Sequence, residues 1–167
     1  MYRNDYLPHL PSGSKHIKSA VNSAHNANMS TRLGYTLSKG GKILKTGFNH
    51  RSPGKYGCHC EMDGISWLID SLRMTRVFRL TLIGKISPPT FKGGYARKGS
   101  TYKMTVVRIL RITDVFANSR PCIECKKWIV VCHKLGINIK IKHTDDDGNF
   151  VKYDGVSVTS AYCHPYA

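Results

Sequence analysis

Apolar residues recur at three- and four-residue steps in two stretches of the chain, which predicts two amphipathic helices. The first covers residues 15 to about 27 and carries Ile17, Val21 and Ala24 on one side. The second follows His59, and its apolar positions are Met62, Ile65, Leu68, Ile69 and Leu72.

A third helix is predicted in "SRPCIECKKWIVVCHKLG" from the residues at its ends. Ser119 or Arg120 is expected near the N-cap, with Pro121 in the first turn and Gly136 just past the end.

Strands are predicted where polar and apolar residues alternate or where β-branched residues cluster. Residues 32–49 alternate around "KGG", and residues 137–156 alternate on either side of "DDGN", so each stretch predicts an antiparallel hairpin. "YKMTVVRILRI" predicts a strand that is buried on both faces. "VFRLTLIG" also fits a strand, whereas "KISPPTFKGGYARKGS" is rich in helix and strand breakers and predicts a long surface loop.

The resulting order, α-β-β-α-β-α-β-β, predicts an α/β fold in which helices flank a mixed sheet of five strands. We expect one domain over residues 15–158, with a basic insertion at about 75–103. Residues 1–14 are interpreted as an N-terminal arm and residues 159–167 as a C-terminal tail.

Composition argues against a membrane or secreted protein. No apolar run approaches the ~20 residues of a membrane span, and "MYRNDYLPHLPSGSKHIK" lacks the apolar core of a secretion signal. We therefore expect an intracellular protein, cytoplasmic or packaged in a virion. In that setting clustered cysteines indicate metal binding or chemistry rather than disulfides.

The charge is strongly basic, with 26 Lys and Arg against 10 Asp and Glu and a net charge of +16. Residues 71–113 contain no acid but ten basic residues, among them Arg97 and Lys98. A segment with this much positive charge attracts phosphates or polynucleotides. The candidate contacts to phosphate or nucleic acid are Arg51, Arg97 and Lys98. The alternative is a cationic surface that only keeps the protein soluble.

Two cysteine-containing motifs indicate a metal site. Cys122 and Cys125 in "PCIEC" are spaced to hold one metal from the first turn of a helix, and His59 in "GCHCEMDG" lies at the start of the preceding helix. Three protein ligands leave the fourth position of zinc open for water, as in catalytic sites. Glu61 is placed to carry protons for that water without binding the metal.

Two alternatives remain open for these residues. A closed structural zinc site would use the thiolates of Cys58, Cys60, Cys122 and Cys125 and leave His59 and Glu61 incidental. Alternatively, the cysteines form disulfides or fill the core.

The H-x-E…P-C-x-x-C pattern resembles the signature of the zinc-dependent cytidine/deoxycytidylate deaminase superfamily, over about Arg32 to Val151. "GKILKTGFNHR" is also similar to deaminase-like proteins of large DNA viruses. The resemblance implies a three-layer cytidine-deaminase-like fold, Zn²⁺ bound by His59, Cys122 and Cys125, Glu61 as proton carrier and Asn49 as a contact to the substrate sugar. It also implies a homo-oligomer or a place in a larger assembly.

The chain departs from the family pattern in two places. Cys60 stands where the family usually has alanine, and the segment between the motifs is longer and more basic than usual. The "DDGN" hairpin favours the branch of the superfamily that acts on free cytidine, because the last two strands would then pair antiparallel.

Three functions follow from these observations. The first is hydrolytic deamination of a cytosine-type nucleoside or nucleotide, with CMP or dCMP suiting the basic chain. The second is deamination of a base within RNA or DNA, which the charge favours. The third is a structural or nucleic-acid-associated role for a deaminase fold, for example in a virion.

Overall fold

The computed structural model describes residues 14–51, 57–87 and 101–153. Four helices lie in this part of the chain: α1 (Lys15–His25), α2 (Cys60–Ser71), α3 (Thr75–Leu82) and α4 (Ile123–Lys134). The strands are β1 (Arg32–Lys39), β2 (Lys42–Phe48), β3 (His50–Arg51), β4 (Gly57–Cys58), β5 (Thr101–Ile109), β6 (Phe116–Ala117), β7 (Asn138–Thr144) and β8 (Phe150–Lys152).

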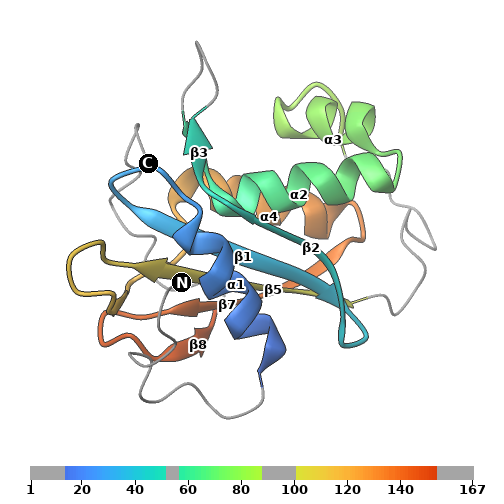
Figure 1. Cartoon of the computed structure of the whole chain (residues 1–167). Helices are drawn as coiled ribbons and strands as arrows, with labels where there is room; N and C mark the ends of the chain where they lie inside the picture. The colour runs from blue at the N-terminus through green and yellow to red at the C-terminus, as the bar shows by residue number, and fades with distance from the viewer. Residues whose placement is uncertain (1–13, 52–56, 88–100, 154–167) are drawn as a thin grey trace.

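The main sheet has the strand order β2-β1-β5-β7-β8, and the short β6 pairs with β5 (Figure 1). Strand β1 is antiparallel to both β2 and β5, β5 is parallel to β7, and β7 is antiparallel to β8. The predicted mixed α/β sheet and both predicted hairpins are therefore confirmed. A second, two-stranded sheet consists of β3 and β4.

Helix α1 covers one face of the sheet. It begins where the Ser14 hydroxyl accepts a hydrogen bond from the backbone N–H of Ile17. Its apolar side packs with Val107 of β5 in a small buried cluster. A Cβ atom on Gly34 of β1 would lie 2.1 Å from the carbonyl oxygen of Ala20, so glycine is required for the helix to approach the strand this closely.

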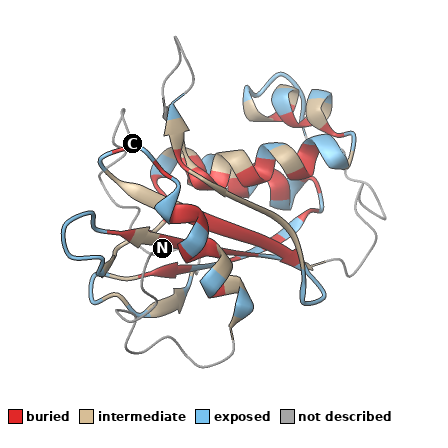
Figure 2. Ribbon diagram, in the orientation of Figure 1, coloured by how far each residue is buried: buried red, intermediate tan, exposed pale blue. Residues whose placement is uncertain are grey.

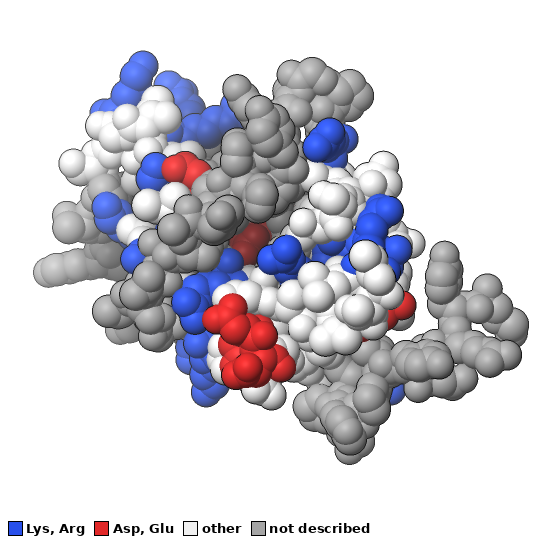
Figure 3. All heavy atoms as spheres, turned by 90° about the vertical axis from the view of Figure 1, so that its left-hand side faces the viewer, with Lys and Arg blue, Asp and Glu red and all other residues white. Residues whose placement is uncertain are grey.

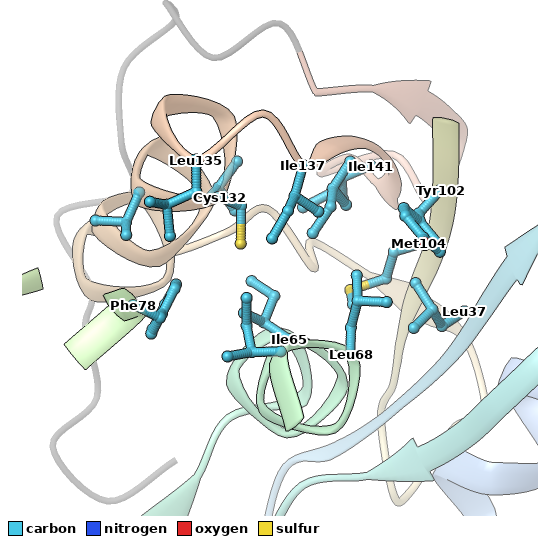
Figure 4. Close-up of a cluster of buried hydrophobic side chains, with 14 of the residues drawn as sticks. Leu37, Ile65, Leu68, Phe78, Tyr102, Met104, Cys132, Leu135, Ile137 and Ile141 are labelled. Carbon is cyan, nitrogen blue, oxygen red and sulfur yellow. The ribbon is translucent and has the colours of Figure 1, made fainter. Parts of the chain in front are cut away.

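Helices α2 and α4 cover the opposite face, and α3 packs against both. The larger hydrophobic cluster lies between these helices and the sheet. Figure 4 shows Ile65 and Leu68 of α2 pointing toward Cys132 of α4 and Ile137. Buried residues concentrate along β1 and on the side of α2 that faces the sheet (Figure 2). The described elements thus form three layers, with the two motif-bearing helices in the same layer.

The structure corrects two local predictions. "VFRLTLIG" is not a strand: most of it belongs to α3, whose buried Phe78 contacts Trp128 of α4 edge-on at 5.2 Å between ring centroids. This helix is stabilised by packing on its neighbours, which a short apolar run does not reveal. Helix α4 also begins later than predicted, with Cys122 as N-cap, so Pro121 precedes the cap instead of lying in the first turn.

Several predictions fall outside the described residues. They concern the N-terminal arm, the C-terminal tail, most of the basic loop and the candidate contacts Arg97 and Lys98. In the part of the chain that the structure describes, no helix is long and apolar enough to cross a membrane.

Candidate metal centre

His59, Cys122 and Cys125 lie together at the N-termini of two helices. His59 is the N-cap residue of α2, Cys122 is the N-cap residue of α4, and Cys125 lies in the first turn of α4. The backbone at both caps is extended, and neither side chain is used to cap its helix. The imidazole and the two thiol groups therefore face one another between the two helix N-termini.

The distances between these side chains fit one tetrahedral metal ion. His59 Nδ1 lies 3.4 Å from Cys122 Sγ and 3.4 Å from Cys125 Sγ. Bond lengths of ~2.0 Å to nitrogen and ~2.3 Å to sulfur at a tetrahedral angle place the two ligand atoms roughly 3.5 Å apart. All three ligand atoms lie within 4.8 Å of one another. The predicted grouping of these residues is confirmed, and the group is close enough to bind a metal ion.

Glu61 borders this group from the first turn of α2. Its side chain is buried, and the thiol of Cys125 donates a hydrogen bond to Oε2 at 3.5 Å. Burial raises the pKa of the Glu61 carboxyl because a buried carboxylate loses its hydration. A buried carboxyl group beside a metal site can hold and release a proton.

Burial and mutual contacts favour the protonated forms of the side chains in this group. A hydrogen bond with Cys122, together with burial, raises the pKa of the Cys125 thiol far above its usual range. A hydrogen bond with Cys122 also raises the pKa of His59. A divalent cation would reverse this balance, because it stabilises thiolates and requires a neutral imidazole. The dipoles of α2 and α4 favour negative charge at the same place.

Cys58 and Cys60 do not belong to this group. The buried Cys60 forms part of the larger hydrophobic cluster, and Cys58 lies near His50 and Asp63 instead. The closed four-thiolate alternative therefore finds no support in the geometry. Among the described residues, no two of the five cysteines form a disulfide, so the disulfide alternative fails there as well.

Ser119 anchors the segment that leads into α4, although the sequence suggested only a cap. Its hydroxyl donates to the carbonyl oxygen of Val106 at 2.9 Å and accepts from the backbone N–H of Thr144 at 2.8 Å. Its own N–H donates to the Thr144 carbonyl oxygen. Ser119 thus joins the segment before α4 to both β5 and β7. These contacts join residues that are distant in sequence, so the sequence could not show them.

Asn49 lies just after β2 and is almost completely buried. Its Oδ1 accepts from the Leu33 N–H at 2.8 Å, and its Nδ2 donates to the Thr31 carbonyl oxygen at 2.8 Å. The amide therefore holds the start of β1 against the end of β2. Its contact to a substrate sugar stays a prediction, as does the contact of the exposed Arg51 with phosphate.

No protein-family model, curated protein or solved structure matches this chain.

Proposed function

We propose that this protein is a zinc-dependent hydrolase that deaminates a cytosine base in a free nucleoside or nucleotide. One observation carries the proposal. His59 Nδ1 lies 3.4 Å from each of two cysteine sulfurs, and the buried carboxyl group of Glu61 contacts one of those sulfurs. Three ligands with an adjacent proton carrier are the arrangement of a hydrolytic zinc site rather than of a closed structural one.

The arrangement of elements supports a cytidine-deaminase-like fold as part of this proposal. Both motifs start helices in one layer, and parallel strands β5 and β7 flank the segment that leads into α4. The antiparallel pairing of β7 with β8 agrees with the branch of the superfamily that the sequence resembles and that acts on free cytidine.

In the proposed reaction His59, Cys122 and Cys125 would hold the zinc. When bound, zinc supplies an activated water as the nucleophile for C4 of the ring. The Glu61 carboxylate would take one proton from the attacking water and deliver it to N3, and would then move the second proton of that oxygen to the amino group, which leaves as ammonia while the oxygen becomes the carbonyl of the product. One water is consumed, and the products are the uracil form and ammonia.

The direct test is ammonia release by the purified zinc-loaded protein from cytidine, CMP, dCMP and a cytosine-containing oligonucleotide. We expect activity on a free nucleoside or nucleotide. Activity on the oligonucleotide alone would replace this proposal with a polynucleotide deaminase. Absence of activity on all four would favour a structural role for the fold.

A lysine cluster on the sheet favours the polynucleotide deaminase as the second candidate. Lys103 of β5 lies directly opposite Lys140 of β7, and Lys142 of β7 lies opposite Lys152 of β8. All four are exposed, and they share the sheet face on which α1 packs. Like charges directly opposite each other destabilise a sheet, so a bound polyanion would relieve their repulsion. Basic side chains also form several groups on the face drawn in Figure 3.

A further inference from the structure

We propose that His50, Cys58 and Asp63 form a second metal site, separate from the group of His59, Cys122 and Cys125. The ligand atoms of the three residues lie within 4.8 Å of one another. Imidazole, thiolate and carboxylate together suit a divalent transition metal of intermediate softness, of which zinc is the most common in proteins.

The backbone brings these three side chains together. His50 and Cys58 are directly opposite partners in the antiparallel pair β3–β4, so their side chains lie on the same side of that ribbon. Asp63 reaches them from the first turn of α2. The ligands thus come from three elements, which is typical of a site that the fold assembles.

The spacing between His50 and Asp63 matches a shared metal better than a direct bond. His50 Nε2 lies 3.6 Å from Asp63 Oδ1, which is too long for a hydrogen bond. A tetrahedral zinc with bonds of about 2.0–2.2 Å to nitrogen and oxygen separates such atoms by roughly 3.4 Å. An ion bound to both atoms would therefore require only a small adjustment.

A second layer of contacts holds Asp63 in this orientation. The hydroxyl of Tyr35 donates to Asp63 Oδ2 at 2.6 Å, which leaves Oδ1 directed at His50. A Cβ atom on Gly47 would lie 2.8 Å from Oδ2 and 2.6 Å from the Tyr35 ring, so the pair depends on a glycine there. Partners of this kind, which fix a carboxylate for coordination, are characteristic of metal sites.

The proposed site is more open than the first one. The side chains of His50 and Asp63 are 39% and 29% exposed. Asp63 also lines a groove of about 680 Å³ between α2, α3 and α4. Cys58 and His59 are adjacent in sequence but belong to different groups. We therefore expect the second ion to exchange with solution while the first stays bound.

Zinc titration of the intact protein tests the proposal. After dialysis, total zinc is measured by mass spectrometry at increasing free Zn²⁺. The wild type should take up a second equivalent beyond the one that it carries after purification. His50→Ala and Cys58→Ser should lose this second equivalent and keep the first. His25→Ala on α1 and Asp70→Asn on α2 serve as matched controls and should bind like the wild type.

Cobalt provides an independent readout of the thiolate. The second equivalent of Co²⁺ should add a thiolate charge-transfer band that Cys58→Ser lacks. The proposal is overturned if the wild type saturates at one equivalent. It is equally overturned if the second equivalent binds unchanged to both Cys58→Ser and His50→Ala, since other surface groups would then hold it.

Discussion

Three consecutive residues, Cys58, His59 and Cys60, have three different surroundings. His59 lies beside the two cysteines of α4, and Cys58 lies near His50 and Asp63. Cys60 is part of the larger hydrophobic cluster. The sequence predicted that His59 lies with Cys122 and Cys125, because H-x-E and P-C-x-x-C each stand at a predicted helix start. It did not predict the group around Cys58, because His50 and Tyr35 approach Asp63 only after the β3–β4 and β1–β2 pairs have formed.

Substitution of the candidate ligands tests the metal site of His59, Cys122 and Cys125. Purified protein should carry about one zinc per chain, and His59→Ala, Cys122→Ala and Cys125→Ala should each lose it because two ligands do not retain the ion. Metal content of the dialysed protein provides the measurement. Cys58→Ser, as control, should keep this zinc. Loss in Cys58→Ser together with retention in His59→Ala would instead establish a thiolate site.

Helices and strands with strong sequence patterns were predicted well. The helix after His59 has a clear apolar stripe, and the hairpins at "KGG" and "DDGN" have strong turn signals. The patterns failed for α3, whose short apolar run fits either a strand or a helix, and for the start of α4. In both cases tertiary contacts decide the local structure: Phe78 packs on Trp128, and Ser119 bonds to residues of β5 and β7.

Ser119→Ala tests the connection between the sheet and α4. Removal of the hydroxyl leaves the buried N–H of Thr144 without this partner, so the free energy of unfolding should fall by about 1–3 kcal/mol. Chemical denaturation measures the change. Ser71→Ala removes an exposed hydroxyl that bonds within α2 and should change stability by less than about 0.5 kcal/mol. Equal effects of the two substitutions would contradict the anchoring role of Ser119.

The charge of the whole molecule exceeds what a site for one small substrate requires. The chain carries +16, and the structure places Lys103, Lys140, Lys142 and Lys152 together on an open part of the sheet. Of these four lysines only Lys103 lies in the acid-free segment 71–113. Cross-strand neighbours such as Lys140 and Lys103 are distant in sequence, so a linear scan of charge could not find this cluster.

The lysine cluster predicts binding to nucleic acid that weakens steeply with salt, because phosphate contacts release counterions. The double variant Lys140→Gln/Lys142→Gln should bind a labelled single-stranded oligonucleotide with lower affinity than the wild type. The slope of log affinity against log salt should fall by about 1.4, as expected for two lost contacts. The control pair Lys126→Gln/Lys134→Gln on α4 should retain the affinity and slope of the wild type. No binding at low salt, or equal loss in both pairs, would contradict a role for this face.

In the proposed reaction Glu61 moves protons beside a zinc ion bound by His59, Cys122 and Cys125. The most direct test of this role is ammonia release from dCMP and cytidine by Glu61→Gln and wild type, with zinc content measured on the same samples. We predict that the variant keeps its zinc and loses roughly 10²–10⁴-fold in rate, because glutamine cannot carry a proton. A zinc-loaded Glu61→Gln variant with activity near that of the wild type would contradict the account.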